Sequence, residues 1–103
     1  MPVIVTAVFH PLPDQRGSLV SVLTASIPAV HAEDGCRLYA IHDAEDGTVT
    51  MLEKWDSRAQ LDAHAAGPAV AKLDEAVRNF IAEPTTVTVM TPLPAGTTEQ
   101  GEL

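Results

Sequence analysis

The chain has 103 residues, and its 14 acidic against 6 basic side chains give a net charge of −8 at pH 7. This length fits one domain, and 46% hydrophobic residues suit a folded core rather than a disordered chain. We expect neither a nucleic acid nor a membrane as partner, because the basic residues are scattered and no apolar run reaches the roughly 18 residues of a membrane span. Since the N-terminus lacks the basic segment of a signal peptide, we expect a cytoplasmic location.

The first third of the chain shows a strand pattern followed by a helix pattern. Residues 3–10 are rich in β-branched residues and stop at prolines, which predicts a strand. Asp14 is a plausible cap for the helix that follows, and Pro28 predicts a kink or an early end near Ser26. The apolar residues at helical spacing in this segment are Val20, Leu23, Ile27 and Val30.

The middle of the chain predicts a hairpin. Residues 36–42 and 48–55 both read as strands, and the turn between them contains an Asp-Gly pair, which is a strong hairpin signal. Two antiparallel strands are therefore expected to be adjacent in the sheet.

The last third predicts two helices and a final strand. Asp56 or Ser57 is positioned to cap a short helix, and Pro68 suits the first turn of another. Residues 85–91 read as the last strand. We therefore expect one domain over residues 1–93 and a flexible acidic tail over residues 94–103.

The order of elements, β-α-β-β-α-α-β, predicts an α+β, ferredoxin-like protomer with a four-stranded antiparallel sheet. In the first strand Val3, Val5 and Phe9 alternate with Ile4 and Val8, so both faces carry apolar side chains. Helices can cover only one of these faces. Because monomers rarely expose large apolar patches, we expect a homodimer that pairs through the sheet faces.

Several segments resemble the antibiotic biosynthesis monooxygenase (ABM) family. They are residues 33–39 (EDGCRLY), 52–55 (LEKW) and 61–64 (LDAH) with Gly67-Pro68 behind them, and the resemblance covers about residues 3–93. It implies a ferredoxin-like protomer that forms a dimeric α+β barrel. Known activities in the family are cofactor-independent oxidation of phenols, anthrones or quinols with O2, haem degradation, and isomerisation of a small sugar-like signal.

The haem-degrading branch of the family fits this sequence poorly. That branch needs a tryptophan where this chain has His64, a histidine on the next helix, and an asparagine in the first strand. Residues 68–81 contain no histidine and residues 3–10 contain no asparagine. No metal-ligand spacing such as His-x-x-x-His is present either. We therefore expect no metal and no cofactor, with O2 as co-substrate.

His64 is the leading candidate for a catalytic group. It follows Leu61 by three residues on the predicted short helix, so both lie on one helical face, which we expect to face the core. An imidazole there can exchange a proton near neutral pH. Glu53 shares a strand face with Trp55 and could accept a hydrogen bond from His64. The alternative is that this pair only pins the helix to the strand.

A second group of residues is predicted to surround an aromatic ligand. Trp55 and Tyr39 would hold its ring, although Trp55 alone in a core poor in aromatics also suits a packing role, and Tyr39 could simply reach the barrel rim. The apolar walls would be Phe9, Leu73 and Val77.

Together these patterns and the resemblance predict a cofactor-independent monooxygenase that oxidises a phenolic, anthrone- or quinol-type small molecule with O2. His64 would act as base and Glu53 would orient it. Two alternatives stay open. One is a non-catalytic small-molecule-binding or stress-related dimer, and the other is a small-ligand isomerase of the same fold, which would favour a wetter pocket.

Overall fold

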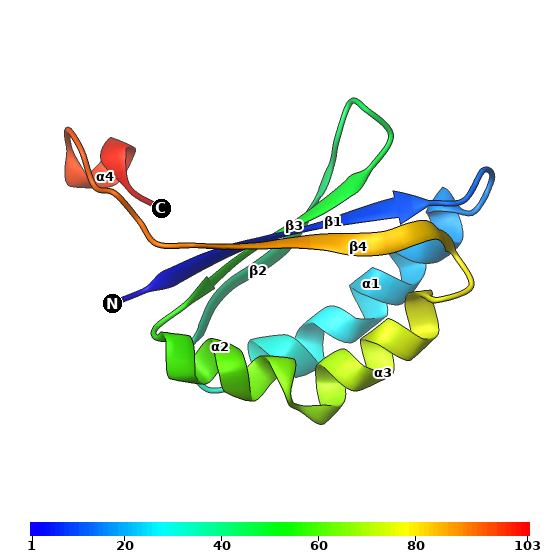
Figure 1. Ribbon diagram of the computed structural model, residues 1–103, viewed down its shortest axis with the longest axis horizontal. Coiled ribbons are helices and arrows are strands. Elements are labelled where there is room, and N and C mark those ends of the chain that lie inside the picture. The colour runs from blue at the N-terminus through cyan, green and yellow to red at the C-terminus, as the bar shows by residue number, and fades with distance from the viewer.

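The computed structural model describes residues 1–103. Its four strands form one antiparallel sheet in the order β2-β3-β1-β4, and α1 to α3 lie together on one side of it (Figure 1). This is the predicted α+β, ferredoxin-like arrangement. In chain order the elements are β1 (Val3–Pro11), α1 (Arg16–His31), β2 (Cys36–Asp43), β3 (Val49–Trp55), α2 (Arg58–Ala65), α3 (Pro68–Val77), β4 (Ile81–Met90) and α4 (Thr98–Gly101). No helix has the length and apolar character that crossing a membrane requires.

Helix α1 differs from its prediction at both ends. Gln15 occupies the N-cap position and Asp14, with φ of 66°, lies in the left-handed region just before it, so the expected Asp14 cap is wrong. The helix also runs through Pro28 to His31 instead of ending near Ser26. Apolar residues of α1 on both sides of Ser26, including Leu23 and Val30, are fully buried. Their burial outweighs the single backbone hydrogen bond that Pro28 cannot donate.

Helices α2 and α3 begin where the sequence places them. The Ser57 hydroxyl accepts a hydrogen bond from the Gln60 backbone N–H at 3.3 Å, which caps α2. Pro68 is the first residue of α3, where its missing N–H costs nothing. These caps fix the points at which α2 and α3 begin, and with them the position of His64.

Strand β4 begins at Ile81, four residues earlier than predicted, and Pro84 lies inside it. The proline is tolerated because β4 is an edge strand and its pairing with β1 shifts register between Val8 and His10. At such an irregular edge the missing N–H removes no regular ladder bond.

The core lies between the sheet and the three helices. Alternate residues of β1 and β3 point into it, and Trp55 and Met51 are fully buried there. The opposite sheet face carries Ile4 and Leu52 and has no helix of α1 to α3 over it. The tail beyond β4 contains the short helix α4, which lies away from α1 to α3 (Figure 1), and the Lys54 ammonium donates a hydrogen bond to the Leu103 carbonyl at 2.6 Å.

Candidate functional site

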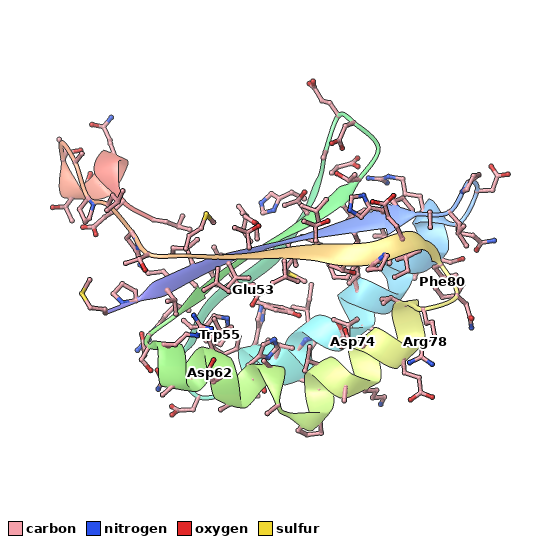
Figure 2. The ribbon with its side chains drawn as sticks, in the orientation of Figure 1. Glu53, Trp55, Asp62, Asp74, Arg78 and Phe80 are labelled. Carbon is pink, nitrogen blue, oxygen red and sulfur yellow. The ribbon has the colours of Figure 1, made fainter.

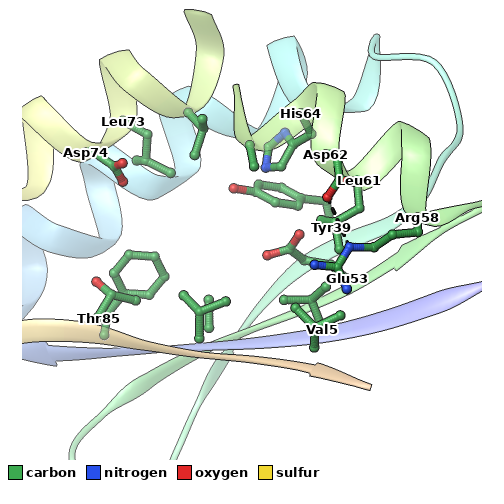
Figure 3. A pocket seen from close by; sticks show the side chains of 16 residues that line it. Val5, Tyr39, Glu53, Arg58, Leu61, Asp62, His64, Leu73, Asp74 and Thr85 are labelled. Carbon is green, nitrogen blue, oxygen red and sulfur yellow. Dashed lines mark hydrogen bonds and ion pairs between the residues drawn. The ribbon is translucent and has the colours of Figure 1, made fainter. Parts of the chain in front are cut away.

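A cavity of about 290 Å³ lies between the sheet and helices α2 and α3, and ten of its sixteen lining residues are hydrophobic (Figure 3). Its volume is at the lower end of the roughly 300–1,000 Å³ typical of small-molecule pockets. Along β4 the cavity wall is exposed: Val87 is 60% and Val89 40% accessible although both point to the helix side of the sheet. A ligand therefore has a route into the cavity along β4.

His64 lines this cavity and is paired with Glu33, which lies in the turn between α1 and β2. The distance from His64 Nδ1 to Glu33 Oε1 is 2.6 Å. When Nδ1 donates its proton to this carboxylate, Nε2 is left as a hydrogen-bond acceptor. Nε2 forms no hydrogen bond within the protein, and no buried side-chain nitrogen or oxygen lacks a partner. Solvent in the cavity therefore reaches Nε2.

The imidazole of His64 packs against two aromatic rings. The Trp55 ring centroid lies 4.6 Å away at an interplanar angle of 30°, and the Tyr39 ring meets His64 edge-on at 5.5 Å and 70°. Only 5% of His64 is accessible. Packing and the bond to Glu33 together leave the ring one orientation.

Glu53 has a different partner from the one predicted. Its Oε1 accepts a hydrogen bond from the Trp55 indole N–H at 2.9 Å, so the expected bond between Glu53 and His64 is wrong. Trp55 is two residues further along the same face of β3, which brings its N–H to Glu53 directly. Glu33 takes the histidine instead. Burial of Glu53 raises the pKa of its carboxyl group, and the Trp55 hydrogen bond and the charge of His64 oppose that rise.

Tyr39 presents its hydroxyl group to the same cavity (Figure 3). The residue is 4% accessible, and burial, followed by the negative charges of Glu53 and Glu33, raises the pKa of the phenol. The phenol therefore stays protonated at neutral pH and can serve as a hydrogen-bond donor.

Five of the predicted site residues come together in this cavity. They are His64, Glu53, Tyr39, Phe9 and Leu73. Trp55 is fully buried and does not line the cavity; it packs against His64 and donates its indole N–H to Glu53. Figure 2 shows Trp55 near Glu53, between the sheet and α2. Val77 lines an adjoining hollow of about 380 Å³.

Sequence reasoning missed Glu33 and the β4 side of the cavity. Glu33 is 31 residues from His64, and no spacing rule connects a turn residue to a helix that distant. Thr85, Val87 and Val89 do carry a signal, since they alternate along the predicted last strand and share one face.

Charged side chains lie at the rim of the cavity. Arg58 Nε donates to Asp62 Oδ1 at 3.0 Å, and Asp74 lines the cavity from α3 (Figure 3). No three histidine, cysteine, aspartate or glutamate side chains gather as metal ligands. The site thus combines one accessible imidazole nitrogen, two protonatable oxygen groups and apolar walls, a set that suits proton transfer with a small aromatic molecule.

Comparison with known proteins places these features in one family. A model of the antibiotic biosynthesis monooxygenase family matches residues 2–76. Rv0793 from Mycobacterium tuberculosis, whose name is "Putative monooxygenase Rv0793", is 39% identical over 93 residues, which are 89% of this chain and 92% of that protein.

Solved structures agree with the fold. The structure of Rv0793 matches with a TM-score of 0.85 at 37% identity, over 94% of this chain and 100% of that chain. A conserved protein from Methanosarcina mazei matches with a TM-score of 0.81 at 18% identity, over 87% and 91% of the two chains. At such low identity the second match shows the shared fold alone.

Proposed function

The chain belongs to the antibiotic biosynthesis monooxygenase family, and from this premise we propose that it is a cofactor-independent monooxygenase. Its substrate would be a small phenolic, anthrone- or quinol-type molecule, which it oxidises with O2. One observation carries this proposal: His64, held at 2.6 Å by Glu33, turns an unpaired ring nitrogen toward a cavity with mostly hydrophobic walls.

The reaction begins with proton transfer. His64 Nε2 accepts a proton from an acidic phenol or activated carbon, and Glu33 stabilises the resulting imidazolium. The electron-rich anion passes one electron to O2, and the radical pair combines as a peroxide. Loss of water, whose formation takes the proton back from His64, leaves a carbonyl group. For an anthrone, one methylene group and one O2 thus give one carbonyl group and one water, and the substrate itself supplies the electrons.

The remaining side chains position the ring. Phe9 and Leu73 provide apolar walls, and Tyr39 provides a hydroxyl group that can bind a substrate oxygen. Trp55 acts one layer behind, through its contacts with His64 and Glu53. The hydrophobic lining favours an aromatic substrate over the small polar ligand of an isomerase.

Oxygen consumption tests the proposal. The purified protein is incubated with an anthrone and with a naphthoquinol while O2 uptake is recorded. We expect uptake above the uncatalysed rate, and a loss of roughly 10²- to 10⁴-fold in His64→Ala, the range for removal of a general base. His42→Ala is the matched control because His42 is exposed and lies outside the cavity. Equal rates for wild type and His64→Ala would refute the role of His64.

A non-catalytic small-molecule-binding protein is the second candidate. The pairs His64–Glu33 and Trp55–Glu53 support it, because these four side chains would then have structural roles without any reaction. This candidate predicts that aromatic ligands raise the melting temperature while no O2 is consumed.

We also propose that two copies pair through the open sheet face. Leu52 and Met90 lie there, on the side opposite the helices; Met90 is 38% accessible and Leu52 is partly exposed, and pairing would bury them. Sedimentation analysis should give a dimer, and Leu52→Glu should shift it to a monomer. A wild-type monomer at micromolar concentration would contradict the pairing.

A further inference from the structure

The carboxyl group of Glu53 has one oxygen available for a ligand. Oε1 accepts the Trp55 indole N–H at 2.9 Å, and Oε2 has no hydrogen bond within the protein. Because no buried side-chain oxygen lacks a partner, solvent reaches Oε2, and the Glu53 carboxyl group points into the cavity in Figure 3. The same side chain is thus anchored at one oxygen and open at the other.

The Tyr39 hydroxyl group points into the same space (Figure 3). It forms no hydrogen bond within the protein, although the residue is only 4% accessible. Tyr39 and Glu53 are cross-strand partners on β2 and β3, which keeps the two side chains on one face of the sheet. Both groups are therefore open to a ligand from the same face of the sheet.

The charges around Glu53 and Tyr39 in the cavity are mainly negative. Arg58 is the only lysine or arginine that lines the cavity, and it is paired with Asp62. The titratable groups near Glu53 on the neighbouring elements are Glu33, Cys36, Tyr39, His64, Asp62 and Asp74. A ligand carboxylate placed here would meet several carboxylates and no free cation, which is unfavourable in a partly dehydrated site.

We propose that Glu53, as a neutral acid, and Tyr39 each donate a hydrogen bond to a carbonyl oxygen of an uncharged aromatic ligand, and that the site discriminates against carboxylates. This inference deepens the proposed function and rests on it for the assumption that a small aromatic molecule enters the cavity. Burial supports it because it raises the pKa of both groups and so favours their protonated forms, and the carboxylates that surround Glu53 act in the same direction.

Two ligands of nearly the same shape test the discrimination. 2-Acetylnaphthalene carries a neutral carbonyl group where 2-naphthoate carries a carboxylate, and neither reacts with O2 under these conditions. Calorimetric titration at pH 6 should show the ketone binding at least about tenfold more tightly, which corresponds to about 1.4 kcal/mol. Equal binding, tighter binding of 2-naphthoate, or no binding of the ketone would overturn the proposal.

Substitutions then test the two donors. Tyr39→Phe should weaken ketone binding by about 2- to 10-fold, the effect of one hydrogen bond. In the wild type, ketone affinity should fall as pH rises through the raised pKa of Glu53, because the ionised carboxylate cannot donate. Glu53→Gln should abolish this fall, since an amide still accepts the Trp55 N–H and donates to the ketone. Glu45→Gln, at an exposed position outside the cavity, is the matched control.

A pH profile that is unchanged in Glu53→Gln would overturn the role of Glu53. These titrations measure binding without oxidation, so they separate the two proposals. If the ketone binds as expected and no anthrone is oxidised, the ligand class stands and the oxygenase proposal fails.

Discussion

The two sides of the cavity are built in different ways. On the side of α2 and β3, buried polar side chains are bonded in pairs: His64 to Glu33, and Trp55 to Glu53. On the side of β4, Val87 and Val89 are 60% and 40% accessible although they point to the helix side of the sheet. The first side holds the His64 imidazole in one orientation. The second side leaves room for a ligand to enter.

One side of the cavity therefore positions a reacting group, and the other side admits the ligand. A proton acceptor must be held in one orientation, and the bonds and rings around His64 do that. Entry and release require a wall whose side chains can change with little loss of stability, and Val87 and Val89, which are already partly in water, meet that need. Substitutions on the two sides should therefore have very different effects on folding.

The largest difference is expected between Trp55→Ala and Val87→Ala. Trp55 is fully buried and hydrogen-bonded, so its truncation should lower the free energy of unfolding by about 3–5 kcal/mol. Val87→Ala should change it by no more than about 0.5 kcal/mol, because the side chain is already largely in water. Urea unfolding followed by circular dichroism measures both. Similar losses in the two variants would remove the contrast.

His64→Ala should have the next largest effect on stability. Loss of the imidazole leaves the Glu33 carboxylate without its partner and opens a gap beside Trp55, which should cost about 1–3 kcal/mol. His42→Ala, at an exposed position, is the control. If both variants unfold at the same urea concentration, the His64–Glu33 pair contributes nothing to the free energy of unfolding.

Glu53→Gln should change how the stability of the protein depends on pH. The pKa of Glu53 is higher in the folded than in the unfolded chain, so the folded state binds more protons and loses stability as pH rises through the folded pKa. The amide does not titrate. As pH rises from about 4.3, the ordinary glutamate value, through the raised folded pKa, the stability of Glu53→Gln relative to wild type should therefore increase. Unfolding curves across this range check it, and a difference independent of pH would contradict the buried acid.

The sequence carries the arrangement of strands and helices because their signals are local. Alternation in residues 3–10 and 48–55, the Asp-Gly turn and Pro68 all report on neighbours in the chain. The full length of α1 was harder to predict, since burial of Val30 beyond Pro28 depends on the sheet that receives it. Helix α1 therefore illustrates tertiary packing overriding a local breaker.

The cavity itself was partly predictable. His64, Glu53 and Tyr39 share faces that the helical and strand periods define, and all three line the cavity. Their hydrogen-bond partners could not be predicted. Two carboxyl groups, Glu33 and Glu53, lie near His64 in the fold, and only the folded chain shows that His64 pairs with Glu33. Glu33 and His64 are 31 residues apart, so their pairing depends on the tertiary fold and not on local sequence patterns.

The central claim is that His64, oriented by Glu33, is the base of an O2-dependent oxidation. Its most direct test is the rate of O2 uptake with an anthrone in wild type, Glu33→Ala and the exposed control Glu45→Ala. We predict a loss of roughly 10- to 100-fold in Glu33→Ala alone, the range seen when the partner that orients a metal-binding histidine is removed. A Glu33→Ala protein that consumes O2 as fast as wild type, or a wild type that consumes none, would contradict the claim.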